Sequence, residues 1–177
     1  MKIGLFYGST TCYTEMVAEK MQTAFHQASD FLLEIHNIKD ISLEACQDYD
    51  FLIFGISTWD YGELQEDWES NWQQVSQLPL SDKITALYGM GDQVGYSEWF
   101  QDALGMLHQQ LEPTGAYIIG YWPNKGYEFT ASKALTADQQ HFVGLSLDDE
   151  TQYHLTDERI EQWVKQLLNE VQQILTS

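Results

Sequence analysis

Short apolar stretches alternate along the chain with longer segments in which apolar residues recur every three or four positions. The apolar stretches cover residues 3–7, 31–35, 49–56, 84–88 and 116–121, and the helical patterns cover residues 15–27, 64–75, 97–111 and 157–175. Strands and helices that alternate in this way predict a parallel sheet covered by helices on both faces. We therefore expect a doubly wound α/β fold, a three-layer sandwich with a five-stranded parallel sheet.

The last apolar stretch is interrupted by a polar segment at residues 122–141 and resumes at Phe142. Because this segment contains Pro123, Gly126 and many Ser and Thr residues, we expect an insertion in the last strand. No linker, repeat or low-complexity stretch divides the chain. Residues 1–177 are therefore expected to form a single domain, a length that suits one hydrophobic core.

The chain is strongly acidic, with 27 Asp and Glu against 8 Lys and Arg and a formal net charge of −19. Nucleic acids and anionic membranes require clustered Lys and Arg, so we exclude both and expect basic protein partners. The acidic stretch at residues 60–69 fits either a solvated face or a docking surface. No apolar run approaches the roughly 20 residues that cross a bilayer, and only two cysteines occur, so we expect a cytoplasmic protein.

A hydroxyl-rich segment separates the first strand from the helical pattern that begins near Glu15. It consists of Ser9, Thr10, Thr11, Cys12, Tyr13 and Thr14. Free backbone N–H groups at a helix N-terminus attract anions, and the hydroxyls add donors. No Lys or Arg follows until Lys20, so the segment predicts a phosphate site built from neutral donors. The simpler interpretation is that the Ser and Thr residues only cap the helix.

Two further loops follow strands and bring aromatic residues with them. The first contains Ser57, Thr58, Trp59, Asp60, Tyr61 and Gly62, and the second contains Gly89, Gly91, Asp92 and Tyr96. Loops after parallel strands emerge at one edge of the sheet, so all three segments are expected to share a site. Trp59 and Tyr96 could stack on a flat heteroaromatic ring, and Asp92 could accept a ring N–H. The histidines show no metal-binding spacing, and we expect no metal.

Together these segments resemble the flavodoxins, small FMN-carrying electron shuttles. The matching segments are residues 9–15, 58–68, 88–96, 120–122, 126–127 and 142–148. The resemblance implies a flavodoxin-like sheet of order 2-1-3-4-5, and the segment at 122–141 is similar to the insertion of long-chain flavodoxins. Cys12 and Tyr13 stand where most flavodoxins have Gly-Asn, a pattern that resembles a second flavodoxin paralogue of some bacteria.

The family implies non-covalently bound FMN, with its phosphate on residues 9–14 and its ring between Trp59 and Tyr96. It also implies ring-edge contacts from the loop after the fourth strand and a place near the ribityl chain for the acidic stretch from Asp148 to Glu150, with Asp148 as the cofactor-binding residue. The protein would then be a low-potential one-electron carrier without catalytic residues, moving electrons from an NADPH-dependent flavodoxin reductase to acceptor enzymes. An FMN-dependent NAD(P)H-quinone oxidoreductase is the alternative.

Overall fold

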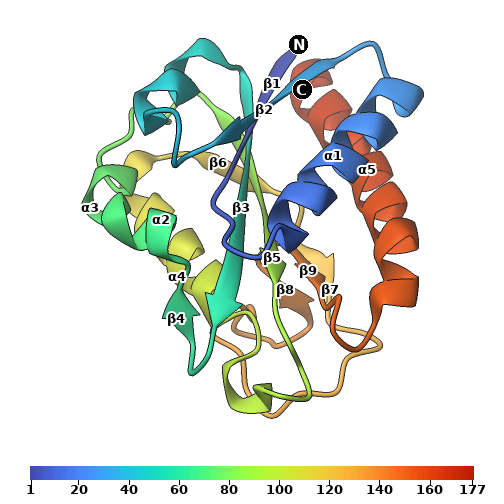
Figure 1. Ribbon diagram of the computed structural model, residues 1–177. Coiled ribbons are helices and arrows are strands. Elements are labelled where there is room, and N and C mark those ends of the chain that lie inside the picture. The colour runs from blue at the N-terminus through green and yellow to red at the C-terminus, as the bar shows by residue number, and fades with distance from the viewer.

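The computed structural model describes residues 1–177 and is built on a central parallel sheet (Figure 1). Its strands are β1 (Lys2–Tyr7), β2 (Leu32–Asn37), β3 (Phe51–Trp59), β5 (Ile84–Met90) and β6 (Tyr117–Ile119), in the order β2-β1-β3-β5-β6. A further strand, β9 (Leu145–Leu147), also pairs with β5. Strand β6 pairs with the first half of β5, and β9 pairs with the second half, so the two are parts of one fifth strand. The predicted strand order is therefore confirmed.

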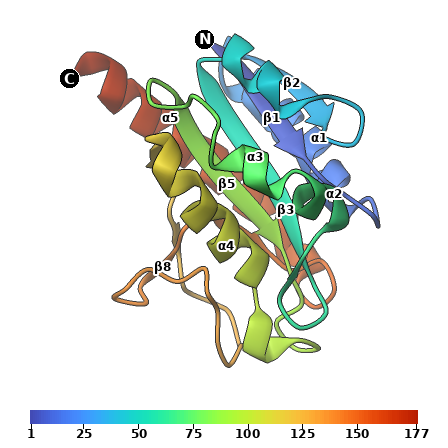
Figure 2. The ribbon, with the colours of Figure 1, turned by 90° about the vertical axis from the view of Figure 1, so that its left-hand side faces the viewer.

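Helices cover both faces of the sheet (Figures 1 and 2). One face is covered by α1 (Tyr13–Ala28) and α5 (Tyr153–Thr176), and the other by α2 (Glu66–Ser70), α3 (Trp72–Val75) and α4 (Asp102–Leu111). Short 3₁₀ turns occur at Leu43–Asp48, Ser97–Trp99 and Glu112–Thr114. None of the helices is long and apolar enough to cross a membrane.

The core contains the apolar parts of the sheet and the inner faces of the helices as one contiguous cluster. Every residue of β5 is buried, as is β3 from Phe51 to Ile56, which explains why these strands are continuously apolar rather than alternating. Trp68 and Trp163 are fully buried in this core. Trp72 is only partly buried against the same cluster.

The helical pattern predicted at residues 64–75 is broken in the structure. A two-residue strand, β4 (Glu63–Leu64), first pairs antiparallel with the end of β3. The buried side chain of Gln65 then caps the start of α2. Asn71 ends this helix by donating from its side chain to the Asp67 carbonyl at 2.7 Å, and α3 begins directly after it. Local side-chain capping of this kind competes with a continuous helix.

The other helix limits also differ from the prediction. The pattern at 97–111 becomes a helix only at Asp102, because Gln101 takes a left-handed conformation with φ +62°. The last helix begins at Tyr153, one turn before the predicted start at 157.

The insertion forms an antiparallel pair of short strands, β7 (Trp122–Pro123) and β8 (His141–Phe142), joined by an irregular segment. Tyr127 anchors this segment, since its hydroxyl accepts from the Trp122 indole at 2.8 Å and donates to the Ser146 carbonyl at 2.6 Å. The Tyr127 ring packs on Phe100 and Phe142. The insertion is therefore packed against the residues that follow β5 (Figure 2).

Candidate functional site

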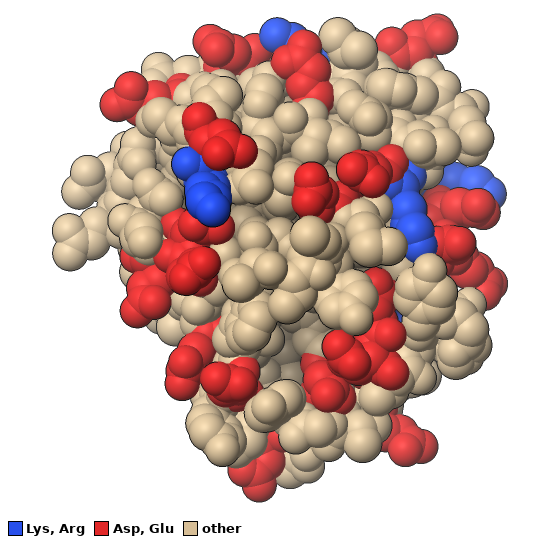
Figure 3. Space-filling view, in the orientation of Figure 1, with Lys and Arg blue, Asp and Glu red and all other residues tan.

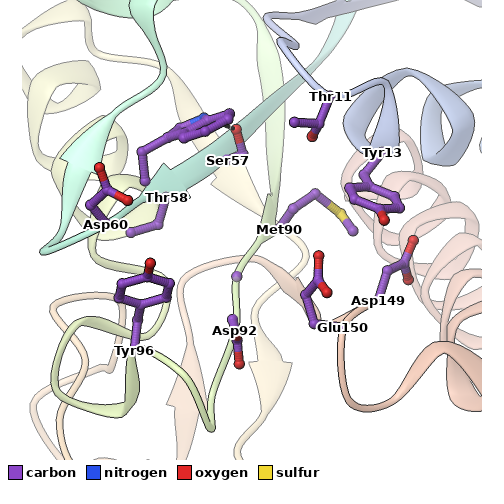
Figure 4. Close-up of a pocket in the computed structure, with 12 residues that line it drawn as sticks. Thr11, Tyr13, Ser57, Thr58, Asp60, Met90, Asp92, Tyr96, Asp149 and Glu150 are labelled. Atoms are coloured by element: carbon purple, nitrogen blue, oxygen red, sulfur yellow. Dashed lines mark hydrogen bonds between the residues drawn. The ribbon is translucent and has the colours of Figure 1, made fainter.

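A pocket of about 330 Å³ opens at the carboxyl ends of β1, β3 and β5 (Figure 4). Its lining comes from the three predicted loops and from the turn before α5. The lining residues are Thr11, Tyr13, Ser57, Thr58, Trp59, Asp60, Met90, Gly91, Asp92, Tyr96, Asp149 and Glu150. The carboxyl end of a parallel sheet thus brings the predicted segments together as expected.

Beside this pocket, the start of α1 offers a row of free hydrogen-bond donors. Met16 is the first residue whose backbone N–H finds an acceptor in the helix, the Cys12 carbonyl at 2.9 Å. The N–H groups of residues 9–15 have no protein acceptor. Cys12 occupies the N-cap position with φ +68° and contributes no side-chain cap. A row of unpaired N–H groups at a helix N-terminus suits the oxygens of an anion.

A tyrosine under the pocket holds the first turn of α1 on the sheet. The hydroxyl of the fully buried Tyr88 donates to the Thr14 carbonyl at 2.8 Å, and burial raises the Tyr88 pKa well above its ordinary value. Gly55 provides the space, because a Cβ at this position would lie 2.2 Å from the Tyr88 ring. The donors at the start of α1 are therefore fixed in position by the neighbouring strands.

Aromatic side chains stand at the two loops that follow β3 and β5. The Trp59 indole donates to the Ser57 hydroxyl at 3.0 Å, which sets the direction of its ring. Tyr96 is 38% exposed and lies across the pocket from Tyr13 (Figure 4). Tyr61 packs edge-on against Tyr96 with 6.3 Å between ring centroids, but it is 68% exposed and does not line the pocket. Both loops thus offer flat apolar surfaces for a ring.

The turn after β3 uses unusual backbone conformations. Asp60 has φ +42° and Gly62 has φ +87°. The turn is tight because Trp59 pairs with Glu63 across it. Gly62 also lies close to α4, since a Cβ there would come within 2.9 Å of the Asp102 carboxylate. Gly62 therefore shapes the turn from outside the pocket.

The loop after β5 is closed by its own aspartate. Asp92 Oδ1 accepts from the backbone N–H groups of Val94 at 3.0 Å and Gly95 at 2.7 Å. One oxygen of Asp92 is therefore occupied by the turn, and the other accepts no hydrogen bond within the protein. Gly91 lines the pocket, whereas Gly89 packs against Gln101 beneath it.

Asp148 is fully buried and does not line the pocket. Its Oδ2 accepts from the backbone and side-chain N–H groups of Gln93 at 3.0 and 2.8 Å and from the Thr151 hydroxyl. Its Oδ1 accepts from the N–H groups of Glu150 and Thr151. The two bonds from Gln93 tie the loop after β5 to the turn before α5, the other three close this turn, and the following residues Asp149 and Glu150 then face the pocket.

The structure places the predicted site residues in two groups. Nine line the pocket: Thr11, Tyr13, Ser57, Thr58, Trp59, Asp60, Gly91, Asp92 and Tyr96. The others lie around it: Ser9, Thr10, Cys12, Thr14, Tyr61, Gly62, Gly89 and Asp148. Asp149 and Glu150 belong to the acidic stretch expected near the ribityl chain, of which only Asp148 was named as a site residue, and Met90 was not predicted at all. Met90 is the last residue of an apolar strand, so its position in the sequence predicts a core residue.

The charge around the pocket is negative throughout. Four carboxylates line it, and no Lys or Arg does. Figure 3 shows acidic side chains on both sides of a hollow in the lower part of this face. Burial raises the pKa of Asp149, and a hydrogen bond from Thr156 opposes this effect. No group of His, Cys, Asp or Glu side chains is arranged to hold a metal ion.

Comparison with known proteins agrees with this geometry. The family model described as flavodoxin matches residues 5–163. Flavodoxin 2 of Escherichia coli strain K12 is 56% identical over 171 residues, covering 97% of each chain, and Flavodoxin 1 of the same strain is 45% identical, covering 95% of this chain and 93% of the relative. The greater identity to Flavodoxin 2 confirms the predicted likeness to a second paralogue.

Solved structures show the same fold. The flavodoxin of Fusobacterium nucleatum bound to flavin mononucleotide superimposes with a TM-score of 0.87 at 24% identity, covering 96% of this chain and 98% of the other. With the family model and relatives matching nearly the whole length, this chain belongs to the flavodoxin family.

Proposed function

We propose that the chain binds FMN non-covalently in this pocket and acts as a one-electron carrier. The observation that supports this most directly is the row of free N–H groups at residues 9–15, next to a pocket with aromatic walls. The flavodoxin of Fusobacterium nucleatum holds flavin mononucleotide in the same fold. When bound, FMN supplies the redox chemistry, and the protein supplies binding and electrostatics.

The residues divide by the part of FMN that their chemistry suits. Backbone N–H groups and hydroxyls at residues 9–14 would hold the phosphate, since both donate to an anion without a positive charge. Trp59 and Tyr96 would pack on the ring, and Gly91 and Asp92 would meet its edge. Asp149 and Glu150 would lie along the ribityl side, where carboxylates accept from sugar-like hydroxyls. Gly62, Gly89 and Asp148 would act by shaping the loops.

The acidic lining has a consequence for the potential of the cofactor. Reduction adds negative charge to the ring system, and four pocket carboxylates without a Lys or Arg oppose that charge. We therefore expect a strongly negative potential for the final reduction step. No side chain is assigned a catalytic role, since the proposed chemistry is transfer of electrons to and from other proteins.

The surface charge also suggests the kind of partner. With a net charge of −19, the chain should associate quickly with basic proteins, such as a flavodoxin reductase that uses NADPH, and with basic acceptor enzymes. We propose that the carrier is a monomer and that residues 1–177 form a single domain. The contiguous core supports the single domain. Both cysteines are free thiols, in keeping with the cytoplasm. The quinone-reductase alternative is not favoured, because the curated relatives bear the name flavodoxin.

A redox titration combined with a turnover assay tests the proposal. The FMN-loaded protein should show a strongly negative final potential and should oxidise NADPH only after a reductase is added. The rate of its reduction by a basic reductase should fall as salt rises, because salt screens the attraction. Direct turnover of NADPH with a quinone, without any reductase, would contradict the carrier function.

A further inference from the structure

Gln65 is a fully buried amide that joins α2 to the hydroxyl-rich segment, although 55 residues separate it from Thr10. Its Oε1 accepts from the N–H groups of Asp67 at 3.1 Å and Trp68 at 3.3 Å. Its Nε2 donates to Asp67 Oδ2 at 2.8 Å and to the Thr10 hydroxyl oxygen at 3.2 Å. Gly8 allows this approach, because a Cβ there would lie 2.2 Å from Oε1.

The orientation of this amide is determined by its partners. Backbone N–H groups only donate, so the end of Gln65 that faces Asp67 N and Trp68 N must be the oxygen. The NH₂ end must then face Thr10. Because Thr10 Oγ1 accepts from this NH₂ group, its own hydrogen points away from Gln65 and remains free to donate. A hydroxyl that already accepts a hydrogen bond is also a better donor.

We propose that Gln65 is a positioning residue for the anion site, which fixes the Thr10 hydroxyl as a donor to the phosphate of FMN. The inference rests on the proposed binding of FMN. A phosphate dianion only accepts hydrogen bonds, whereas a free hydroxyl can turn either way. In a site whose lining has no Lys or Arg, each hydroxyl held in the donating direction contributes directly to affinity. Gln65 achieves this without lining the pocket.

The test compares FMN with riboflavin, which has the same ring and no phosphate. Gln65→Met keeps the size of the side chain and removes both the NH₂ group and the oxygen that caps α2. We expect it to weaken FMN binding about tenfold, near the lower end of the range for a hydrogen bond to a charged group, and to leave riboflavin binding within about twofold. Thr10→Val should weaken FMN binding at least as much, Thr10→Ser should restore binding, and the double variant should show no loss beyond that of Thr10→Val.

Two additional variants separate positioning from folding. Asn71→Ala removes a hydrogen bond at the other end of α2 and should leave the ratio of FMN to riboflavin affinity unchanged. Gln65→Glu keeps an acceptor for the two N–H groups but presents an oxygen to Thr10 and to the Asp67 carboxylate, the two acceptors of the present NH₂ group. The hydroxyl should then turn toward residue 65, and FMN affinity should fall at least as far as in Gln65→Met, again without a loss for riboflavin.

The outcomes distinguish this inference from the proposed function. Equal losses for FMN and riboflavin in Gln65→Met, or losses that add in the double variant with Thr10→Val, would overturn the positioning role alone. A wild-type chain that takes up no FMN would overturn the proposed function and the inference with it.

Discussion

Replacement of Asp148 by Asn provides a strong test of how the pocket is held together. Asp148 is buried without any positively charged partner, and its carboxylate relies on hydrogen bonds from neutral donors. In Asp148→Asn, the remaining oxygen can still accept from the N–H groups of Glu150 and Thr151. The new NH₂ group, however, faces two N–H groups of Gln93, which cannot accept.

The size of the effect follows from this mismatch. The Gln93 amide cannot turn over, because its Oε1 already accepts from the Glu128 N–H at 2.6 Å. The Gln93 backbone N–H therefore loses its acceptor, at about 1–3 kcal/mol, and Gln93 Nε2 keeps only the longer hydrogen bond of 3.4 Å to the Thr151 hydroxyl. Loss of the buried charge offsets part of this cost. We expect Asp148→Asn to lower the free energy of unfolding by about 2–4 kcal/mol, because the lost hydrogen bonds cost more than removal of the buried charge gains.

Urea denaturation of the apoprotein measures the change, with FMN affinity as a second readout because the loop after β5 should loosen. Asp92→Asn is the matched control, since Asp92 accepts only through Oδ1, and an Asn oxygen can replace it. The control should change stability by less than about 0.5 kcal/mol. If Asp148→Asn behaved like the control, Asp148 would not hold the two loops together.

Three further outcomes are expected. Tyr88→Phe removes the hydrogen bond to the Thr14 carbonyl and should lower the free energy of unfolding by about 1 kcal/mol in urea denaturation; an unchanged midpoint would show that this bond contributes nothing. The apoprotein should react with one equivalent of thiol reagent at the exposed Cys12, FMN should slow this reaction, and Cys46 should stay unreactive because burial raises its pKa to about 12. Burial lowers the pKa of His108 below 6.5, so the unfolded chain binds the proton more readily, and this site should destabilise the fold as pH falls below 6.5. His108→Gln should reduce this pH dependence of the free energy of unfolding. Identical stability profiles against pH in the variant and the wild type would contradict the assignment.

The centre of the sheet could be predicted because β1, β3 and β5 are apolar runs that are buried over most of their length. The breaks in the helices could not, because they depend on single residues. Gln101 adopts a left-handed conformation that its residue type does not favour, and it delays the start of α4. Asn71 ends α2 through a side-chain hydrogen bond that periodicity does not show.

The site was predictable to the extent that its residues stand out by type. Trp59 and Tyr96 are aromatic residues on loops, and the Ser and Thr cluster precedes a helix. Direction and distance were not predictable. Asp148 turns inward because it accepts from Gln93, a residue of another loop. The contact between Gln65 and Thr10 joins distant segments, so only the folded chain reveals it.

Calorimetric titration of FMN into the apoprotein at low and high salt tests the central claim most directly. The phosphate is proposed to be held by amides and hydroxyls, in a protein whose net charge is −19. Binding should be one to one, and its affinity should not weaken as salt rises, because screening reduces overall repulsion and leaves short hydrogen bonds intact. No uptake of FMN, or an affinity that falls steeply with salt as expected for a cationic site, would contradict the account.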